Sequence, residues 1–237
     1  MSLITKTIDY QEGNQTFEGY FAYTNATKKM PAILIVHDWT GKNPFACRKA
    51  EQLAELNYVG FALDMFGKGI LGQTKEEKMA LIQPLLADRL TLQKRLLAAF
   101  NTVKQLDCVD STRIGIMGFC FGGLCALDLA RSGVDIKGAV SFHGLLHAPE
   151  GLAQKQIKAK VLALHGYDDP MVTPDQVMAF ANEMTHNNTD WQLNIYGHTM
   201  HAFTNPEAND KAFGTVYRKE ADERSWIAMK NFFTEIF

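Results

Sequence analysis

The residues Gly118-Phe119-Cys120-Phe121-Gly122-Gly123 carry the most informative pattern in this chain. The apolar run 113–117 before them is typical of a buried strand, and the segment 124–130 after them is typical of a helix. A strand, a Gly-X-Cys-X-Gly turn and a helix in this order make the pattern of a nucleophile elbow, with cysteine where serine is usual. The glycines permit a sharp turn, and the start of a helix favours the thiolate, which is the form that attacks. The alternative is a buried, inert cysteine in a Gly-rich turn.

Length and composition predict one globular domain spanning 1–237. The chain has 237 residues, 46% of them hydrophobic, with a formal net charge of -2, which gives no electrostatic reason to expect nucleic acid or a membrane surface as a partner. Its four cysteines lack metal-type spacing, so we expect free thiols in a reducing, cytoplasmic setting, with no metal and no cofactor. A monomer and a homodimer are both compatible with the sequence.

Apolar strands alternate with helices along the chain. Two strands, 3–10 and 15–24, flank a Gly-Asn turn and predict an antiparallel hairpin. Five further strands are predicted besides the one before Cys120: 32–36, 59–65, 137–142, 160–165 and 191–196. Helices are predicted at 44–56, 75–106, 124–130, 173–186 and 219–237, the second of them broken or kinked near Gln83 by Pro84. The alternation predicts an α/β fold with a mostly parallel central sheet and helices on both faces.

Two loops after Cys120 offer an acid and a base. The first, 165–172, contains Asp168 and Asp169, and the second, 197–203, contains His198 and His201. Both loops follow strands, and the order nucleophile, acid, histidine is that of the α/β-hydrolase triad. We favour Asp169, because the following proline would aim its carboxylate, and His201. The alternatives are Asp168 and His198.

Other polar and aromatic residues at strand ends complete the candidate site. An oxyanion needs two N–H donors, for which we choose the backbone amides of Phe121 and Trp39. Asp38 either contacts the resting thiol or caps its own loop. We expect three further histidines to be structural and to bond the backbone: His37, His143 and His165. The substrate pocket is predicted to include, besides Trp39, Phe121 and Asp38, the residues Phe66, Phe119, Met171, Phe203 and Asn205.

Together these motifs make the chain resemble the dienelactone hydrolase family over nearly its whole length. The resemblance rests on residues 118–123, then on 166–170 and on His201-Ala202-Phe203. It implies the α/β-hydrolase fold and a Cys-His-Asp triad that hydrolyses a lactone or carboxylic ester without a cofactor, through a thioester acyl-enzyme. It also places the second oxyanion donor at Trp39.

The chain departs from the founding enzymes of that family at two positions. Asp38 stands where they have a glutamate thought to restrain the thiol, and Asn205 stands where they have an arginine that grips a substrate carboxylate. Arg89 is either a substitute cation or a solvent-facing or salt-bridged helix residue.

Two other classes of function stay open. One is a different hydrolase on the same scaffold: a thioesterase, a general carboxylesterase or an acyl-peptide hydrolase. The other is a non-catalytic protein in which Cys120 is an oxidation-sensitive thiol.

Overall fold

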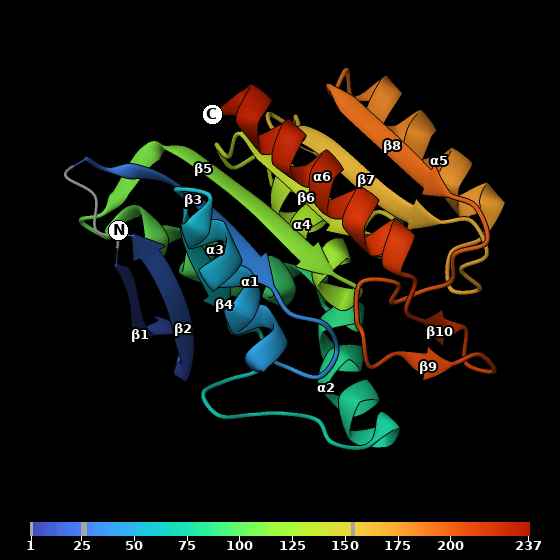
Figure 1. Cartoon of the computed structure of the whole chain (residues 1–237), viewed down its shortest axis with the longest axis horizontal. Coiled ribbons are helices and arrows are strands. Elements are labelled where there is room, and N and C mark those ends of the chain that lie inside the picture. The colour runs from blue at the N-terminus through green and yellow to red at the C-terminus, as the bar shows by residue number, and fades with distance from the viewer. Residues whose placement is uncertain (1, 25–27, 153–154) are drawn as a thin grey trace. The chain divides into compact units, whose positions relative to one another are not determined.

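A computed structural model describes residues 2–24, 28–152 and 155–237 of the chain (Figure 1). Its backbone groups into two compact units, residues 1–117 and 118–237. The boundary between them falls inside β5 (Val109–Phe119), the strand that leads to the Gly-rich turn. The expectation that 1–237 is a single domain stays a prediction.

The first unit is built on strands in the order β1-β2-β4-β3-β5. The first four are β1 (Leu3–Glu12), β2 (Gln15–Thr24), β3 (Met30–Val36) and β4 (Val59–Leu63). β1 and β2 form the predicted antiparallel hairpin, turning at Gly13, whose φ of 56° suits a residue without a side chain. β3 and β4 are parallel, and both are almost completely buried, as their continuous apolar runs predicted.

Three helices pack within this unit: α1 (Pro44–Glu55), α2 (Lys75–Ala87) and α3 (Arg89–Lys104). α1 lies against β2 and β4, and α3 contacts β1. Gly60 explains how closely α1 approaches β4, because a Cβ at that position would lie 2.3 Å from the Ala50 carbonyl oxygen.

Of the two alternatives at Pro84, a break near Gln83 is wrong, because the helix ends several residues later. α2 continues through Pro84 to Ala87, and Asp88 separates it from α3. The Asp88 amide closes the last turn of α2 on the Pro84 carbonyl at 2.9 Å, while its carboxylate accepts the Thr91 amide at 3.0 Å and caps α3. The capping side chain therefore sets the boundary, because it satisfies an amide at the start of the new helix.

The second unit contains three parallel strands in the order β6-β7-β8. Its elements are β6 (Gly138–Phe142), β7 (Lys160–Gly166), β8 (Trp191–Tyr196), α4 (Phe121–Arg131), α5 (Pro174–His186) and α6 (Lys219–Ile236). α4 packs on β6, and α6 runs along β6 and β7 (Figure 1). A short antiparallel pair, β9 (Asn209–Asp210) with β10 (Thr215–Val216), was not predicted.

No helix within the described part of the chain is both long enough and apolar enough to cross a membrane.

Candidate active site

Cys120 occupies the sharp turn between β5 and α4, as the motif predicted. Its φ of 56° and ψ of -117° lie in a region that non-glycine residues rarely adopt. The turn closes tightly, because a Cβ on Gly118 would lie 2.0 Å from the Gly122 carbonyl oxygen. The Cys120 amide donates to the Phe142 carbonyl at 3.0 Å and to His143 Nδ1 at 3.1 Å. The strained backbone is thus held by neighbouring groups, and the cysteine side chain is left partly exposed.

Asp169 and His201 form a buried hydrogen-bonded pair. The Asp169 Oδ2 atom lies 2.7 Å from His201 Nδ1, and both side chains are almost wholly excluded from solvent. The other carboxylate oxygen of Asp169 accepts the Met171 amide at 2.8 Å, which orients the carboxyl group. The carboxylate therefore fixes Nδ1 as the protonated ring nitrogen and leaves Nε2 for chemistry.

The loop that carries His201 is held by β10. The His201 amide donates to the Gly214 carbonyl at 3.0 Å, and its carbonyl accepts the Val216 amide at 3.0 Å. His201 and Thr215 form an isolated bridge of the parallel type. The unpredicted β9–β10 pair thus positions the backbone that carries the imidazole.

Burial and two negative charges act in opposite directions on His201. Burial, the largest influence, lowers the pKa of the imidazole, but the charges on Cys120 and Asp169 outweigh it and raise that pKa to about 10. His201 Nε2 is buried and has no hydrogen-bond partner among the described residues. The Cys120 sulfur nevertheless lies close enough to raise the pKa of the imidazole. The raised pKa favours the imidazolium form of His201 at neutral pH.

The two alternative residues lie apart from this pair. The Asp168 side chain is 42% exposed and His198 is 92% exposed, with 4.0 Å between the carboxylate and Nδ1 of His198. The structure therefore brings Asp169, and not Asp168, to His201.

His143 accepts a backbone amide, as predicted, and that amide belongs to Cys120. Its ring is buried, lies 5.1 Å from the His201 ring centroid, and bonds Thr204 through Nε2 at 2.8 Å. The partners Cys120 and Thr204 were not predicted. The available signal was the position of His143 directly after β6, at a strand end where site residues gather in such sheets.

The predicted pocket residues of the second unit are largely packed. Phe119 stacks on Phe142 at 4.7 Å, and Phe203 meets the His143 ring edge-on at 5.0 Å. Both are almost fully buried, whereas Met171 is half-buried. Asn205 uses its side-chain oxygen to accept the Glu207 amide at 3.0 Å, which is a turn-capping contact. Phe121 begins α4.

The predicted residues of the first unit occupy loops after β3 and β4. The Asp38 carboxylate accepts the Thr40 amide at 2.8 Å, which is the loop-capping alternative named above. The Trp39 ring lies 5.6 Å from the Lys78 ammonium, and Phe66 packs edge-on against His37 at 4.7 Å. Their roles in oxyanion binding and substrate contact stay predictions. Arg89 is buried at the first position of α3, so the solvent-facing interpretation is wrong.

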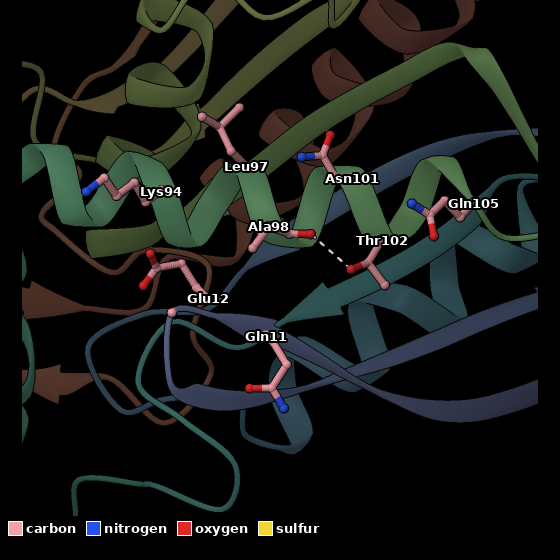
Figure 2. A pocket seen from close by; sticks show the side chains of 9 residues that line it. Gln11, Glu12, Lys94, Leu97, Ala98, Asn101, Thr102 and Gln105 are labelled. Atoms are coloured by element: carbon pink, nitrogen blue, oxygen red, sulfur yellow. Dashed lines mark hydrogen bonds between the residues drawn. The ribbon is translucent and has the colours of Figure 1, made fainter.

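Elsewhere in the first unit, a groove of about 460 Å³ runs between the β1–β2 turn and α3 (Figure 2). Glu12 and Lys94 supply its charges, and the lining residue Thr102 donates to the Ala98 carbonyl at 2.9 Å. Among the residues that the structure describes, no cysteine or histidine lines it, and none of the residues predicted for chemistry is among its lining residues. Within the described ranges, no three Cys, His, Asp or Glu side chains gather as a metal site would require.

Comparison with known proteins identifies the kind of protein to which this geometry belongs. Residues 17–237 match the sequence model of the Dienelactone hydrolase family. The chain belongs to the dienelactone hydrolase family. It is 26% identical to a putative carboxymethylenebutenolidase of Aquifex aeolicus (strain VF5), with 95% of this chain and 96% of that protein covered.

Two further relatives agree with this assignment. A probable 2-oxo-3-(5-oxofuran-2-ylidene)propanoate lactonase of Bradyrhizobium sp is 27% identical, with 92% of this chain and 89% of that protein covered. The crystal structure of P91, a dienelactone hydrolase-like promiscuous phosphotriesterase from metagenomic libraries, is 31% identical, with a TM-score of 0.93 over 100% of both chains. The protein is therefore an ester or lactone hydrolase of the α/β-hydrolase fold with a mostly parallel central sheet.

Proposed function

We propose that this dienelactone hydrolase family member cleaves a carboxylic ester or lactone through a triad of Cys120, His201 and Asp169, without a cofactor. The supporting observation is the 2.7 Å contact between Asp169 Oδ2 and His201 Nδ1, in an imidazole whose pKa the neighbouring Cys120 and Asp169 charges raise to about 10 against the opposing effect of burial. A buried acid–histidine pair beside a nucleophile at a strand–helix turn is the arrangement that activates a nucleophile for acyl transfer.

The first half of the reaction forms a thioester. The Cys120 thiolate attacks the carbonyl carbon, and the carbonyl electron pair moves to oxygen, where the amides of Phe121 and Trp39 are proposed to stabilise it. The C–O bond then breaks, and His201 gives its proton to the departing alkoxide. The acyl group is left on sulfur, and His201 is left neutral.

The second half regenerates the enzyme. Neutral His201 takes a proton from water, and the resulting hydroxide attacks the thioester carbonyl. The carbon–sulfur bond breaks, the carboxylic acid leaves and releases its proton to solvent, and the thiolate again faces the imidazolium. Asp169 stabilises the imidazolium in both halves without itself taking the proton.

Replacement of Cys120 tests this mechanism directly. Cys120→Ala is expected to abolish hydrolysis of an activated ester such as p-nitrophenyl acetate, while Cys47→Ala serves as the control and retains the rate. A mass increase equal to one acyl group, on the peptide that contains Cys120, should accompany turnover. Hydrolysis at the normal rate by Cys120→Ala would eliminate the proposed nucleophile.

Cys120→Ser should lose most activity, because the imidazolium–thiolate pair cannot form with a hydroxyl.

The substrate class is the finer part of the proposal. We expect a small ester or lactone without a recognised carboxylate, because Asn205 is engaged in its own turn and stands where the founding enzymes have an arginine. A panel containing an aryl ester, a five-membered lactone, an acyl thioester and an acyl-amino-acid amide separates the alternatives. A phosphotriester belongs in the panel because of the 31% identity to P91.

The redox alternative makes an opposite prediction. An oxidation-sensitive, non-catalytic Cys120 would gain oxygen in dilute peroxide and would turn over no member of the panel. Cys125 is completely buried and supplies no exposed second thiol near the turn. The monomeric or homodimeric state and the cytoplasmic setting stay predictions.

A further inference from the structure

His143 joins the two segments on which the proposed reaction depends. One ring nitrogen, Nδ1, receives the amide of Cys120 at 3.1 Å. The other, Nε2, lies 2.8 Å from the hydroxyl of Thr204, three residues after His201 in the same loop. A single buried ring thus connects the nucleophile turn to the loop that carries the base.

The contacts determine which nitrogen carries the proton. The Cys120 amide is a donor, so Nδ1 must present its lone pair, and in a neutral imidazole the proton then resides on Nε2. Nε2 therefore donates to the Thr204 oxygen. A doubly protonated ring would turn a donor toward the Cys120 amide and break that bond.

The surroundings keep His143 neutral. Burial lowers its pKa well below the ordinary value, and the charge of nearby His201 lowers it further. The ring is also held from its sides, because Phe203 meets it edge-on at 5.0 Å and Phe119 lies 6.2 Å away. A backbone φ of 39° at His143 shows that the chain accepts an unfavourable conformation to present the ring.

We propose that His143 is a positioning residue that sets the separation between the Cys120 sulfur and His201 Nε2 by linking the Cys120 amide to Thr204. This inference rests on the proposed function, and it adds a residue that takes no proton in the proposed reaction and acts through Cys120 and Thr204. Its two bonds span 23 and 61 residues along the chain, so the link between the two segments is a tertiary contact.

Three substitutions separate the contributions of the two hydrogen bonds that His143 makes. Thr204→Val removes the acceptor for Nε2–H at nearly constant shape and leaves the imidazole in place. His143→Asn retains an oxygen that can accept from the Cys120 amide but loses the bond to Thr204. His143→Phe fills the volume and loses both bonds. Thr189→Val is the matched control, since the Thr189 hydroxyl is buried and has no hydrogen-bond partner among the residues that the structure describes.

The expected result is a loss in kcat with little change in KM. A displacement of a reacting group by about 1 Å can cost on the order of 100-fold in rate. We therefore expect about a 100-fold loss in kcat for His143→Phe, about tenfold for Thr204→Val, a loss between these for His143→Asn, and none for Thr189→Val. Thermal midpoints of all variants are measured in parallel. Reduced midpoints with kcat within twofold of the parent would assign His143 to packing alone.

Two measurements do not depend on ester hydrolysis. The rate at which iodoacetamide alkylates Cys120 should fall several-fold in Thr204→Val, because a displaced imidazole activates the sulfur less. Nitrogen-15 NMR of the parent should show the His143 proton on Nε2, and a proton on Nδ1 would overturn the proposal. Absence of hydrolysis in the parent would instead reject the proposed function and leave these two results to decide the role of His143.

Discussion

At the scale of single residues, Cys120 is held in an uncommon conformation by ordinary contacts. Its amide has two acceptors, the Phe142 carbonyl and His143 Nδ1, and its side chain stands at the start of α4. A backbone in a sparsely populated region costs on the order of 1–3 kcal/mol and persists where its surroundings over-determine it. Few contacts fix the acid–histidine pair. Asp169 Oδ1 accepts the Met171 amide, and Asp169 Oδ2 lies beside His201 Nδ1.

Replacing Asp169 by asparagine tests the acid of the proposed triad. In Asp169→Asn the new side chain would retain the shape but turn an amide donor or a weaker acceptor toward His201 Nδ1, which disfavours the tautomer that leaves Nε2 for chemistry. We expect kcat/KM for an activated ester to fall by roughly 10²- to 10⁴-fold.

The neighbouring carboxylate is the control for that experiment. Asp168→Asn changes a half-exposed side chain that lies 4.0 Å from the exposed His198, so kcat/KM should stay within about twofold. Equal losses in the two variants would show that the Asp169 contact has no special part in the reaction.

At the scale of elements, close backbone approaches shape the site. Gly123 has no space for a side chain, since its Cβ would lie 2.6 Å from Ser141 Oγ and 2.7 Å from Gly144 Cα. α4 therefore approaches β6 more closely than any larger residue would allow. The His201 loop depends on a different device, the main-chain bonds to Gly214 and Val216. Both devices act through the backbone, so the side chains of the site remain available for chemistry.

Gly118→Ala should destabilise the fold through the turn itself. The new methyl group would lie 2.0 Å from the Gly122 carbonyl oxygen, a backbone atom that cannot move independently. Overpacking of this kind costs about 1–3 kcal/mol, and we expect at least the upper part of that range in urea unfolding. Failure of the variant to fold would agree with the same argument.

Gly197→Ala provides the matched control at a strand end. A Cβ at Gly197 would meet no atom within 4 Å, so the free energy of unfolding should change by no more than about 0.5 kcal/mol. If the two alanine variants were equally stable, the close approach at Gly118 would not constrain the turn.

At the scale of the whole molecule, buried neutral histidines recur at strand ends in both units. His37 accepts the Met65 amide through Nε2 at 3.1 Å, with Nδ1 2.6 Å from the Asp38 carbonyl. His143 accepts the Cys120 amide through Nδ1 and bonds Thr204 through Nε2. His165 is buried, and its Nδ1 has no hydrogen-bond partner among the described residues. Burial is the largest cause that lowers the pKa of each of the three.

These three histidines predict a loss of stability in mild acid. In the unfolded chain they bind protons as the pH falls below about 6.5, while in the folded chain they resist protonation. Their contribution is therefore fully present above about pH 6.5 and is lost as the pH falls toward their lowered folded-state pKa values. Each proton contributes about 1.4 kcal/mol per pH unit, so the slope could reach about 4 kcal/mol per pH unit. Urea unfolding at pH 7, 6 and 5.5 measures it.

His165→Phe isolates one of the three. The variant removes a ring whose Nδ1 lacks a described partner, so the slope should decrease, by no more than about 1.4 kcal/mol per pH unit. His186→Gln, on the exposed end of α5, is the control and should leave the slope unchanged. An undiminished slope in His165→Phe would place the acid sensitivity elsewhere in the molecule.

Local pattern was sufficient for the order of the longer strands and of most helices, for the turn at Cys120 and for the order of nucleophile, acid and histidine. These features depend on neighbours in the chain: apolar runs, a glycine on each side of Cys120, and a proline after Asp169. The sequence pattern also left two candidates for the acid, Asp168 and Asp169, and two for the base, His198 and His201. It failed near Pro84, because the capping side chain of Asp88 determined the helix boundary.

Tertiary structure alone decided which side chains meet. The pairing of His201 with Asp169 spans 32 residues, the bond between His143 and Thr204 spans 61, and the β9–β10 pair that supports His201 consists of strands of two residues each. Hydrophobic periodicity carries no information about such contacts, because they depend on strand register and on the course of loops. The sequence by itself thus determined the elements and the reactive groups, whereas the folded chain decided their partners, because distances between remote residues are set by packing and not by spacing along the chain.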